Sequence, residues 1–177
     1  MLFRSKNGIT EIVTGSVEKM LGFYLEKKLV IAPPTIKEGD KIKGEFLAVI
    51  PLSSPKFIGT VAISMDEEFC LALARAMLGD AEGTQTFSEH DRLDVVSEIS
   101  NQLAGILQEQ LQAKGFDVNI GLPRSAHGHH LRFIHPGRNQ VSEVCLSMEL
   151  PKKGFLKRLI SSSVQTSTIE FCFDSVA

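Results

Sequence analysis

The stretch SEHDRLDVVSEISNQLAGILQEQLQAKG, residues 88–115, has the pattern of one long amphipathic helix. Ser88 is suited to cap its N-terminus, acidic residues follow in the first turn, and Gly115 is suited to end it. At a rise of 1.5 Å per residue, about 26 helical residues extend roughly 39 Å. The sequence therefore predicts one long helix ahead of the strand-like residues 116–121.

The two faces of this helix differ when successive residues are placed 100° apart. Apolar side chains that we expect to pack on a sheet gather on one face: Val96, Ile99, Leu103, Ile106 and Leu107. Polar residues and one glycine gather on the opposite face: Asp94, Glu98, Asn101, Gly105, Gln108 and Gln112. Glu98 and Asn101, at positions i and i+3, are therefore neighbours that point to solvent or to a partner.

A polar outer face on a helix usually means only solvation, and spacing alone favours that interpretation here. Two residues count modestly against it. Asn101 is a mediocre helix former, and Gly105, one turn further on, costs about 1 kcal/mol relative to alanine in a helix interior. Gly105 removes a side chain at a place where another surface would need to approach.

The rest of the chain predicts helices and strands on both sides of the long helix. Helices are predicted at residues 9–26 and 66–79, with a short helical turn within 151–163. The predicted strands are residues 44–52, 56–65, 116–121, 130–135, 140–150 and 166–173. The first two form a hairpin separated by Ser53, Ser54 and Pro55, and 130–135 pairs with 140–150 through a turn at Pro136 and Gly137. This order predicts an α/β (α+β) fold with a largely antiparallel sheet covered by helices.

Composition narrows the class of protein. A chain of 177 residues with 43% hydrophobic content suits one globular domain, residues 1–177. A net charge of −2 gives no broad cationic face, so nucleic acid is not an expected partner. No apolar run approaches the roughly 20 residues that span a bilayer, and the start MLFRSKNGIT lacks the apolar centre of a secretory signal. We therefore expect a soluble cytoplasmic protein without membrane association.

Cysteine and histidine give no strong catalytic pattern. Three cysteines without a CxxC pair indicate thiols in a reducing compartment that pack in the core: Cys70, Cys145 and Cys172. Four histidines invite a metal-site interpretation: His127, His129, His130 and His135. Their spacing matches no HExxH or Cys/His pattern, and a polar loop and strand edge explain them better. The motifs GxSxG, GxxxxGK[ST] and GxGxxG are also missing from the sequence. A hydrolase with a serine nucleophile and a nucleotide-binding protein therefore have little support.

The motif Asp94-x-x-x-Glu98-x-x-Asn101, followed later by Pro123, resembles the signature of the CheC/CheX/FliY family. Members of that family are phosphatases of the phosphorylated response regulator CheY in bacterial chemotaxis. The wider strings SEISNQLAGILQEQLQAKGFDVNIGLP and VAISMDEEFCLALARAMLG fit it too, and the resemblance covers about residues 9–174.

The first predicted helix bears on the type of family member. CheC-type members commonly carry two such sites on pseudosymmetric helices, whereas CheX-type members carry one. Glu11 is present in the helix at 9–26, but Thr14 stands where the second motif would have asparagine. The chain therefore resembles a CheX-like member, and what the resemblance implies is one CheC/CheX-like domain with a single site.

The resemblance implies that Glu98 and Asn101 are the catalytic residues. Phosphoryl transfer through a loose transition state needs a water held in line more than it needs covalent help. We hypothesise that Asn101 enters the regulator's active site and orients that water without removing a proton, while the family precedent pairs Glu98 with the regulator's lysine. Asp94, Gly105 and Gln108 are the expected partner-binding residues.

Cofactors and partners follow from the same resemblance. Mg²⁺ is expected on the partner regulator, and we expect no cofactor or metal on this chain. A homodimer is expected because CheX-type members often pair through sheet edges. Pro123 is expected to shape the strand under the helix. The alternative is a non-catalytic module of the same fold that binds a response regulator or flagellar component, and a third class is a small-molecule sensor or structural protein.

Overall fold

The computed structural model describes residues 6–25, 29–33, 35–37, 39–80, 83–135, 142–149 and 164–175. Its helices are α1 (Lys6–Tyr24), α2 (Glu67–Leu78) and α3 (Glu89–Ala113). Its strands are β1 (Leu29–Ile31), β2 (Thr35–Ile36), β3 (Phe46–Ser54), β4 (Phe57–Met65), β5 (Asn119–Ile120), β6 (Arg124–His127), β7 (Ser142–Glu149) and β8 (Val164–Ser175). The predicted turn at Pro136 and Gly137 and the predicted helical turn within 151–163 lie outside the described residues.

The strands form one eight-stranded sheet in the order β1-β7-β8-β4-β3-β5, with β2 beside β7 and β6 beside β3. All of these pairs are antiparallel, which confirms the predicted sheet class. The predicted hairpin is β3–β4, but its register runs from Phe46 opposite Met65 to Ser54 opposite Phe57. Ser53 and Ser54 therefore belong to the strand, and the turn is Pro55–Lys56.

The predicted pairing of residues 130–135 with 140–150 is wrong. β7 pairs with β8 along its whole length, and residues 130–135 contribute only an isolated bridge from Arg132 to Lys41. His130 has a left-handed backbone, with φ of 61°, which interrupts an extended segment. His135 is buried and turns its imidazole to Thr60 and Glu170.

The segment predicted as one strand at 116–121 is also shorter in the structure. Only Asn119–Ile120 forms a strand, β5, and Pro123 separates it from β6. Both β5 and β6 pair with β3, so the chain follows the same neighbouring strand on either side of the proline. Proline cannot donate to a ladder, which explains the break between β5 and β6. Strand β6 lies beyond the predicted range 116–121 and was not predicted from the sequence.

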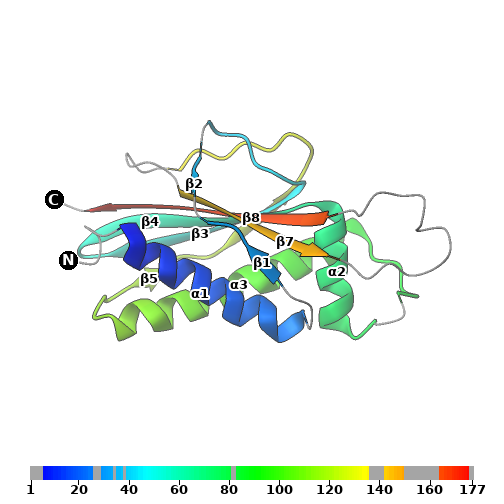
Figure 1. Cartoon of the computed structure of the whole chain (residues 1–177), viewed down its shortest axis with the longest axis horizontal. Coiled ribbons are helices and arrows are strands. Elements are labelled where there is room, and N and C mark those ends of the chain that lie inside the picture. Colours follow the sequence, from blue (N-terminus) through cyan, green and yellow to red (C-terminus); the bar gives the residue numbers. More distant parts are fainter. Residues whose placement is uncertain are drawn as a thin grey trace.

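The helices cover one face of the sheet (Figure 1), and α1 and α3 lie side by side on it. Alternate residues of β3 point to this face and are buried there: Phe46, Ala48, Ile50 and Leu52. The predicted inward face of α3 joins the same core through Val96, Ile99, Leu103 and Leu107. The apolar stripe of α3 is thereby fixed against the sheet, which leaves its polar stripe on the outside.

The opposite face of the sheet is covered by the chain segments around Ile42 and Leu131 (Figure 1), which form a second, smaller apolar cluster with Leu47 and Ala62. Beside this cluster lies a buried polar network. Lys37 Nζ lies 2.6 Å from Glu170 Oε2, with the two side chains 4% and 1% exposed. His135 Nε2 lies 3.4 Å from the same carboxylate oxygen. This network ties the covering segments to β8.

Candidate functional site

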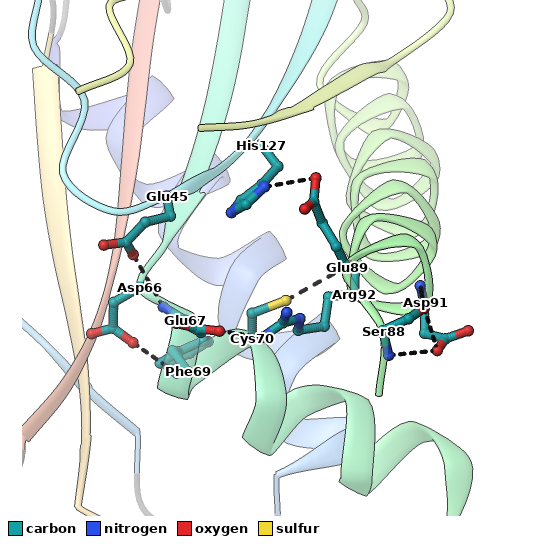
Figure 2. Close-up of polar contacts among 10 residues, drawn as sticks. All are labelled: Glu45, Asp66, Glu67, Phe69, Cys70, Ser88, Glu89, Asp91, Arg92 and His127. Carbon is teal, nitrogen blue, oxygen red and sulfur yellow. Dashed lines mark hydrogen bonds and ion pairs between the residues drawn. The ribbon is translucent and has the colours of Figure 1, made fainter. Parts of the chain in front are cut away.

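The N-terminus of α3 is fixed by a capping box. The Ser88 hydroxyl accepts a hydrogen bond from the Asp91 amide at 3.2 Å, and the Asp91 carboxylate accepts one from the Ser88 amide at 2.7 Å (Figure 2). Hydrogen bonds from the Ser88 hydroxyl and amide hold the pKa of Asp91 below its usual value. The helix therefore begins at the residue that the sequence predicts.

Residues from three neighbouring elements contact the first turns of α3, and Figure 2 shows two of these contacts, from Glu67 and His127. Arg92 forms an ion pair with Glu67 at the start of α2, and its guanidinium lies 5.5 Å from the centre of the Phe46 ring. His127, at the end of β6, has Nδ1 2.8 Å from Glu89 Oε1. These contacts tie the N-terminal turns of α3 to α2 and to the neighbouring strands β3 and β6.

Cys70 lies at the same junction, where its thiol donates to the carbonyl oxygen of Arg92 at 3.6 Å (Figure 2). Burial raises the pKa of the Cys70 thiol to about 12, so at neutral pH it is not a thiolate. Cys172 is buried as well, which confirms core packing for these two cysteines. The side chain of Cys145 lies outside the described residues.

The predicted site residues form a ridge along α3. Asp94, Glu98, Asn101 and Gly105 are all exposed. A Cβ added at Gly105 would meet no atom within 4 Å. Gln108 is only half-buried, and its amide donates to the carbonyl oxygen of Val118 at 2.9 Å. The structure thus brings four of the five predicted residues to one open surface, whereas the Gln108 amide is engaged within the fold.

Polar contacts between described side chains occur on and beside this ridge. His90 Nδ1 lies 3.1 Å from Asp94 Oδ2, one turn away on the same helix. The Gln102 amide donates to Glu98 Oε1 at 2.7 Å, and the Tyr24 hydroxyl donates to Gln102 Oε1 at 2.8 Å. Gln102 stands at i+4 from Glu98, a spacing visible in the sequence, but nothing in the sequence indicates the contact with Tyr24.

Asn101 differs from its neighbours. Among the described residues, no hydrogen bond or ion pair holds its side chain. The carbonyl oxygen and the NH₂ group of its exposed amide are therefore both free to bind water. A primary amide can donate and accept at the same time, so it can orient a water molecule without changing its own protonation state. Glu98 and Asn101 together offer one carboxylate and one amide on adjacent turns of an exposed helix.

The counterpart helix α1 runs antiparallel to α3, since Lys19 meets Glu109 at 3.4 Å while Tyr24 meets Gln102. Glu11, which stands where a second motif would have its glutamate, is exposed on α1. Thr14, however, donates its hydroxyl to the carbonyl oxygen of Thr10 at 2.8 Å and carries no amide. Only α3 presents both members of the Glu/Asn pair.

The four histidines do not gather in one place. His127 stacks on Phe46 and pairs with Glu89, whereas His135 is buried on the other face of the sheet beside Glu170. Within the described ranges, no three histidine, cysteine, aspartate or glutamate side chains lie close enough to hold a metal ion. In the same part of the chain, no helix has both the length and the apolar character needed to cross a membrane.

Residues 46–147 match the family model described as chemotaxis phosphatase CheX, which is more than half of the chain. The chain belongs to the CheX family. The matched segment includes β3, β4, α2 and all of α3, so it contains the whole ridge of predicted site residues. Among curated protein sequences, none matches this CheX-family chain.

Solved structures share the CheX fold. The chemotaxis protein CheX of Desulfovibrio desulfuricans is 19% identical, with a TM-score of 0.74 over 94% of this chain and 99% of its own. CheX of Vibrio vulnificus is 23% identical, with a TM-score of 0.73 over 92% and 97% of the two chains. A CheX-CheY-BeF3-Mg²⁺ complex from Borrelia burgdorferi contains a chain that is 20% identical, with a TM-score of 0.62 over 93% and 94%. At these identities the likeness establishes the fold.

Proposed function

We propose that this CheX-family member hydrolyses the aspartyl phosphate of a CheY-like response regulator in chemotaxis signalling. The observation that carries the proposal is the pair Glu98 and Asn101, exposed on adjacent turns of α3 in a member of a chemotaxis phosphatase family. A related fold has been solved together with CheY, beryllium fluoride and Mg²⁺, which supports a CheY-like partner. The carboxylate and the amide are the groups that would enter that partner's phosphorylated pocket.

The chemistry requires a water oxygen to attack the phosphorus in line with the aspartyl oxygen. The bond from phosphorus to that oxygen breaks, the regulator's carboxylate leaves, and inorganic phosphate forms with the proton of the water passing to phosphate or solvent. In this proposal the Asn101 amide holds the water in line, and the regulator's own Mg²⁺ and lysine neutralise the charge. Orientation alone can supply a large part of such a rate increase.

Glu98 serves binding and register. Its carboxylate pairs with the active-site lysine of the regulator, a charge-assisted contact worth roughly 1.5–3 kcal/mol where water is excluded. Asp94 lies one turn earlier and supports docking. The Asp94 carboxylate already lies 3.1 Å from the imidazole of His90, so Asp94 is a weaker candidate than Glu98 for a direct contact with the partner. We still predict that Gln108 lies at the edge of the contact with the partner. Its amide already donates to the carbonyl oxygen of Val118, so we assign it no direct bond to the partner.

A phosphate-release assay tests this function. CheY of the same organism, phosphorylated with acetyl phosphate and freed from it, is expected to lose phosphate much faster with the protein than alone. A faster release also separates the phosphatase from the alternative, a module that binds the regulator or a flagellar component without catalysis. If the protein binds phosphorylated CheY and leaves its lifetime unchanged, the alternative is correct. A sensor or structural role would give neither binding nor release.

Gly105 provides a test of where the partner docks. Gly105→Phe is expected to keep the fold, since a Cβ there meets no atom, but to weaken association with phosphorylated CheY by roughly tenfold or more through a steric clash. Gly105→Ala is expected to stabilise α3 by about 1 kcal/mol in urea unfolding. Gln112→Phe, an exposed aromatic further along the same helix, is the matched control. Equal affinity of Gly105→Phe and the wild type would remove Gly105 from the interface.

Besides the roles of the site residues and the cytoplasmic location, three further expectations from the sequence stay predictions. They are the homodimer, the single domain over residues 1–177, and Mg²⁺ bound by the regulator and not by this chain. The first concerns assembly and does not bear on the chemistry of the Glu98/Asn101 pair. The third places the only metal of the reaction on the partner.

A further inference from the structure

We propose that Gln102 and Tyr24 are positioning residues that hold the Glu98 carboxylate ready for the partner. This proposal rests on the proposed function, because it concerns the same site. It is carried by a continuous line of hydrogen bonds across two helices: the Tyr24 hydroxyl to Gln102 Oε1 at 2.8 Å, and Gln102 Nε2 to Glu98 Oε1 at 2.7 Å.

The direction of each hydrogen bond is determined by its neighbours. An ionised Glu98 has only acceptors, so the Gln102 amide must turn its NH₂ toward the carboxylate. Its carbonyl oxygen then faces Tyr24, whose hydroxyl must donate. The reversed amide would place its oxygen against the carboxylate, which is repulsive. The relay therefore favours one orientation of the Gln102 amide.

The relay reaches Glu98 from outside its own helix. A glutamine at i+4 on an exposed helix face restricts a glutamate only weakly by itself, since both long side chains can rotate away into solvent. Gln102 is half-buried, and its carbonyl oxygen is held by Tyr24, which belongs to α1 and is half-buried as well. The Tyr24 ring also lies edge-on to Phe23, with ring centres 5.3 Å apart. Helix α1 thus supplies a fixed point from which Glu98 is oriented.

The consequence for binding lies in the two oxygens of Glu98. Oε1 is occupied by Gln102, whereas Oε2 has no hydrogen bond or ion pair with the described part of the chain. A carboxylate held by one oxygen presents the other in a fixed direction, suited to a single cationic group of the partner. Fixing the side chain before binding avoids an entropic cost that a mobile glutamate would meet on association. The relay should therefore act on affinity and not on the chemical step.

Two substitutions interrupt the relay at different points. Tyr24→Phe removes one hydroxyl and keeps the ring, and Gln102→Met keeps the length of the side chain without its amide. Each is expected to raise the KM for phosphorylated CheY about threefold to tenfold, the range that one hydrogen bond supplies, with kcat within about twofold of the wild type. The dissociation constant for CheY loaded with beryllium fluoride and Mg²⁺ should rise by the same factor. In a Glu98→Ala background, neither substitution should have any further effect.

The matched control is Lys19→Met, which deletes a second polar contact between α1 and α3, the exposed Lys19–Glu109 pair. It is expected to leave KM, kcat and affinity unchanged. A merely structural role for Tyr24 would lower the thermal midpoint and kcat, and its effect would persist without Glu98; that pattern overturns the proposal. The proposal is also overturned if both relay variants have the KM and the affinity of the wild type. That result would leave the proposed phosphatase function intact.

Failure of the proposed function gives a different pattern. If the wild type binds the loaded CheY but releases no phosphate, catalysis is absent, and the affinity measurements still decide whether Tyr24 and Gln102 act through Glu98. If the wild type neither binds nor releases phosphate, both proposals are wrong. The relay is supported only by a loss of affinity in both variants that disappears when Glu98 is removed.

Discussion

Asn101→Ala is expected to slow the hydrolysis of phosphorylated CheY by about a hundredfold to a thousandfold, the loss seen when one oriented polar group is taken from an active site. The water would then have no fixed place in line with the aspartyl oxygen, while the regulator's Mg²⁺ and lysine would still be present. Single-turnover phosphate release with saturating protein measures the chemical step directly. The affinity for beryllium-fluoride-loaded CheY should change by no more than about threefold, since Glu98 supplies the binding contact.

The fold of the Asn101→Ala variant should be unharmed. Asn101 is exposed and makes no hydrogen bond with the described residues, and alanine is the better helix former by about 0.5 kcal/mol. Its thermal midpoint should therefore equal or exceed that of the wild type. Gln112→Ala, which removes an exposed amide elsewhere on the same helix, is the matched control and should keep full activity. Full activity in Asn101→Ala would show that the water is held by another group.

Local signals in the sequence were sufficient to predict α3 and its ridge. The N-terminal cap of α3 involves Ser88 and Asp91, which are three positions apart in the sequence. The spacing of these two residue types is therefore enough to predict where the helix begins. The same holds for the exposure of Glu98 and Asn101, because the 3.6-residue period places them opposite Ile99 and Leu103, which are fully buried. Their catalytic use, in contrast, came only from the family resemblance and is still to be tested.

Contacts between distant segments were not predictable in this way. β7 pairs with β8, which begins well after it, and periodicity does not say which strand is the neighbour. The hydrogen bond from Tyr24 to Gln102 joins two residues that are 78 positions apart in the sequence and lie on different helices. The ion pair of Lys37 with Glu170 is also invisible in the sequence, since a lysine in a polar segment usually indicates solvent exposure. Each of these depends on tertiary packing that a single sequence does not encode locally.

The largest expected effect on stability is at Glu170. Glu170→Leu would leave the Lys37 ammonium buried without its counter-charge, 2.6 Å from where the carboxylate oxygen had been. Loss of one member of a buried ion pair costs about 3–5 kcal/mol, a large fraction of the 5–15 kcal/mol that usually separates folded from unfolded domains. Urea unfolding followed by circular dichroism should show a lower midpoint with an unchanged slope.

A second substitution shows whether the unpaired charge is the cause. Lys37→Met added to Glu170→Leu replaces the pair with apolar side chains of similar length, and it is expected to restore at least half of the lost free energy of unfolding. His135 lies 3.4 Å from the same carboxylate and loses a neighbour in both variants, so it cannot account for a difference between them. Equal instability of the single and double variants would mean that Glu170 acts through His135 instead. A loss below about 1 kcal/mol in Glu170→Leu would mean that Lys37 reaches water, as exposed pairs do, contrary to the burial seen here.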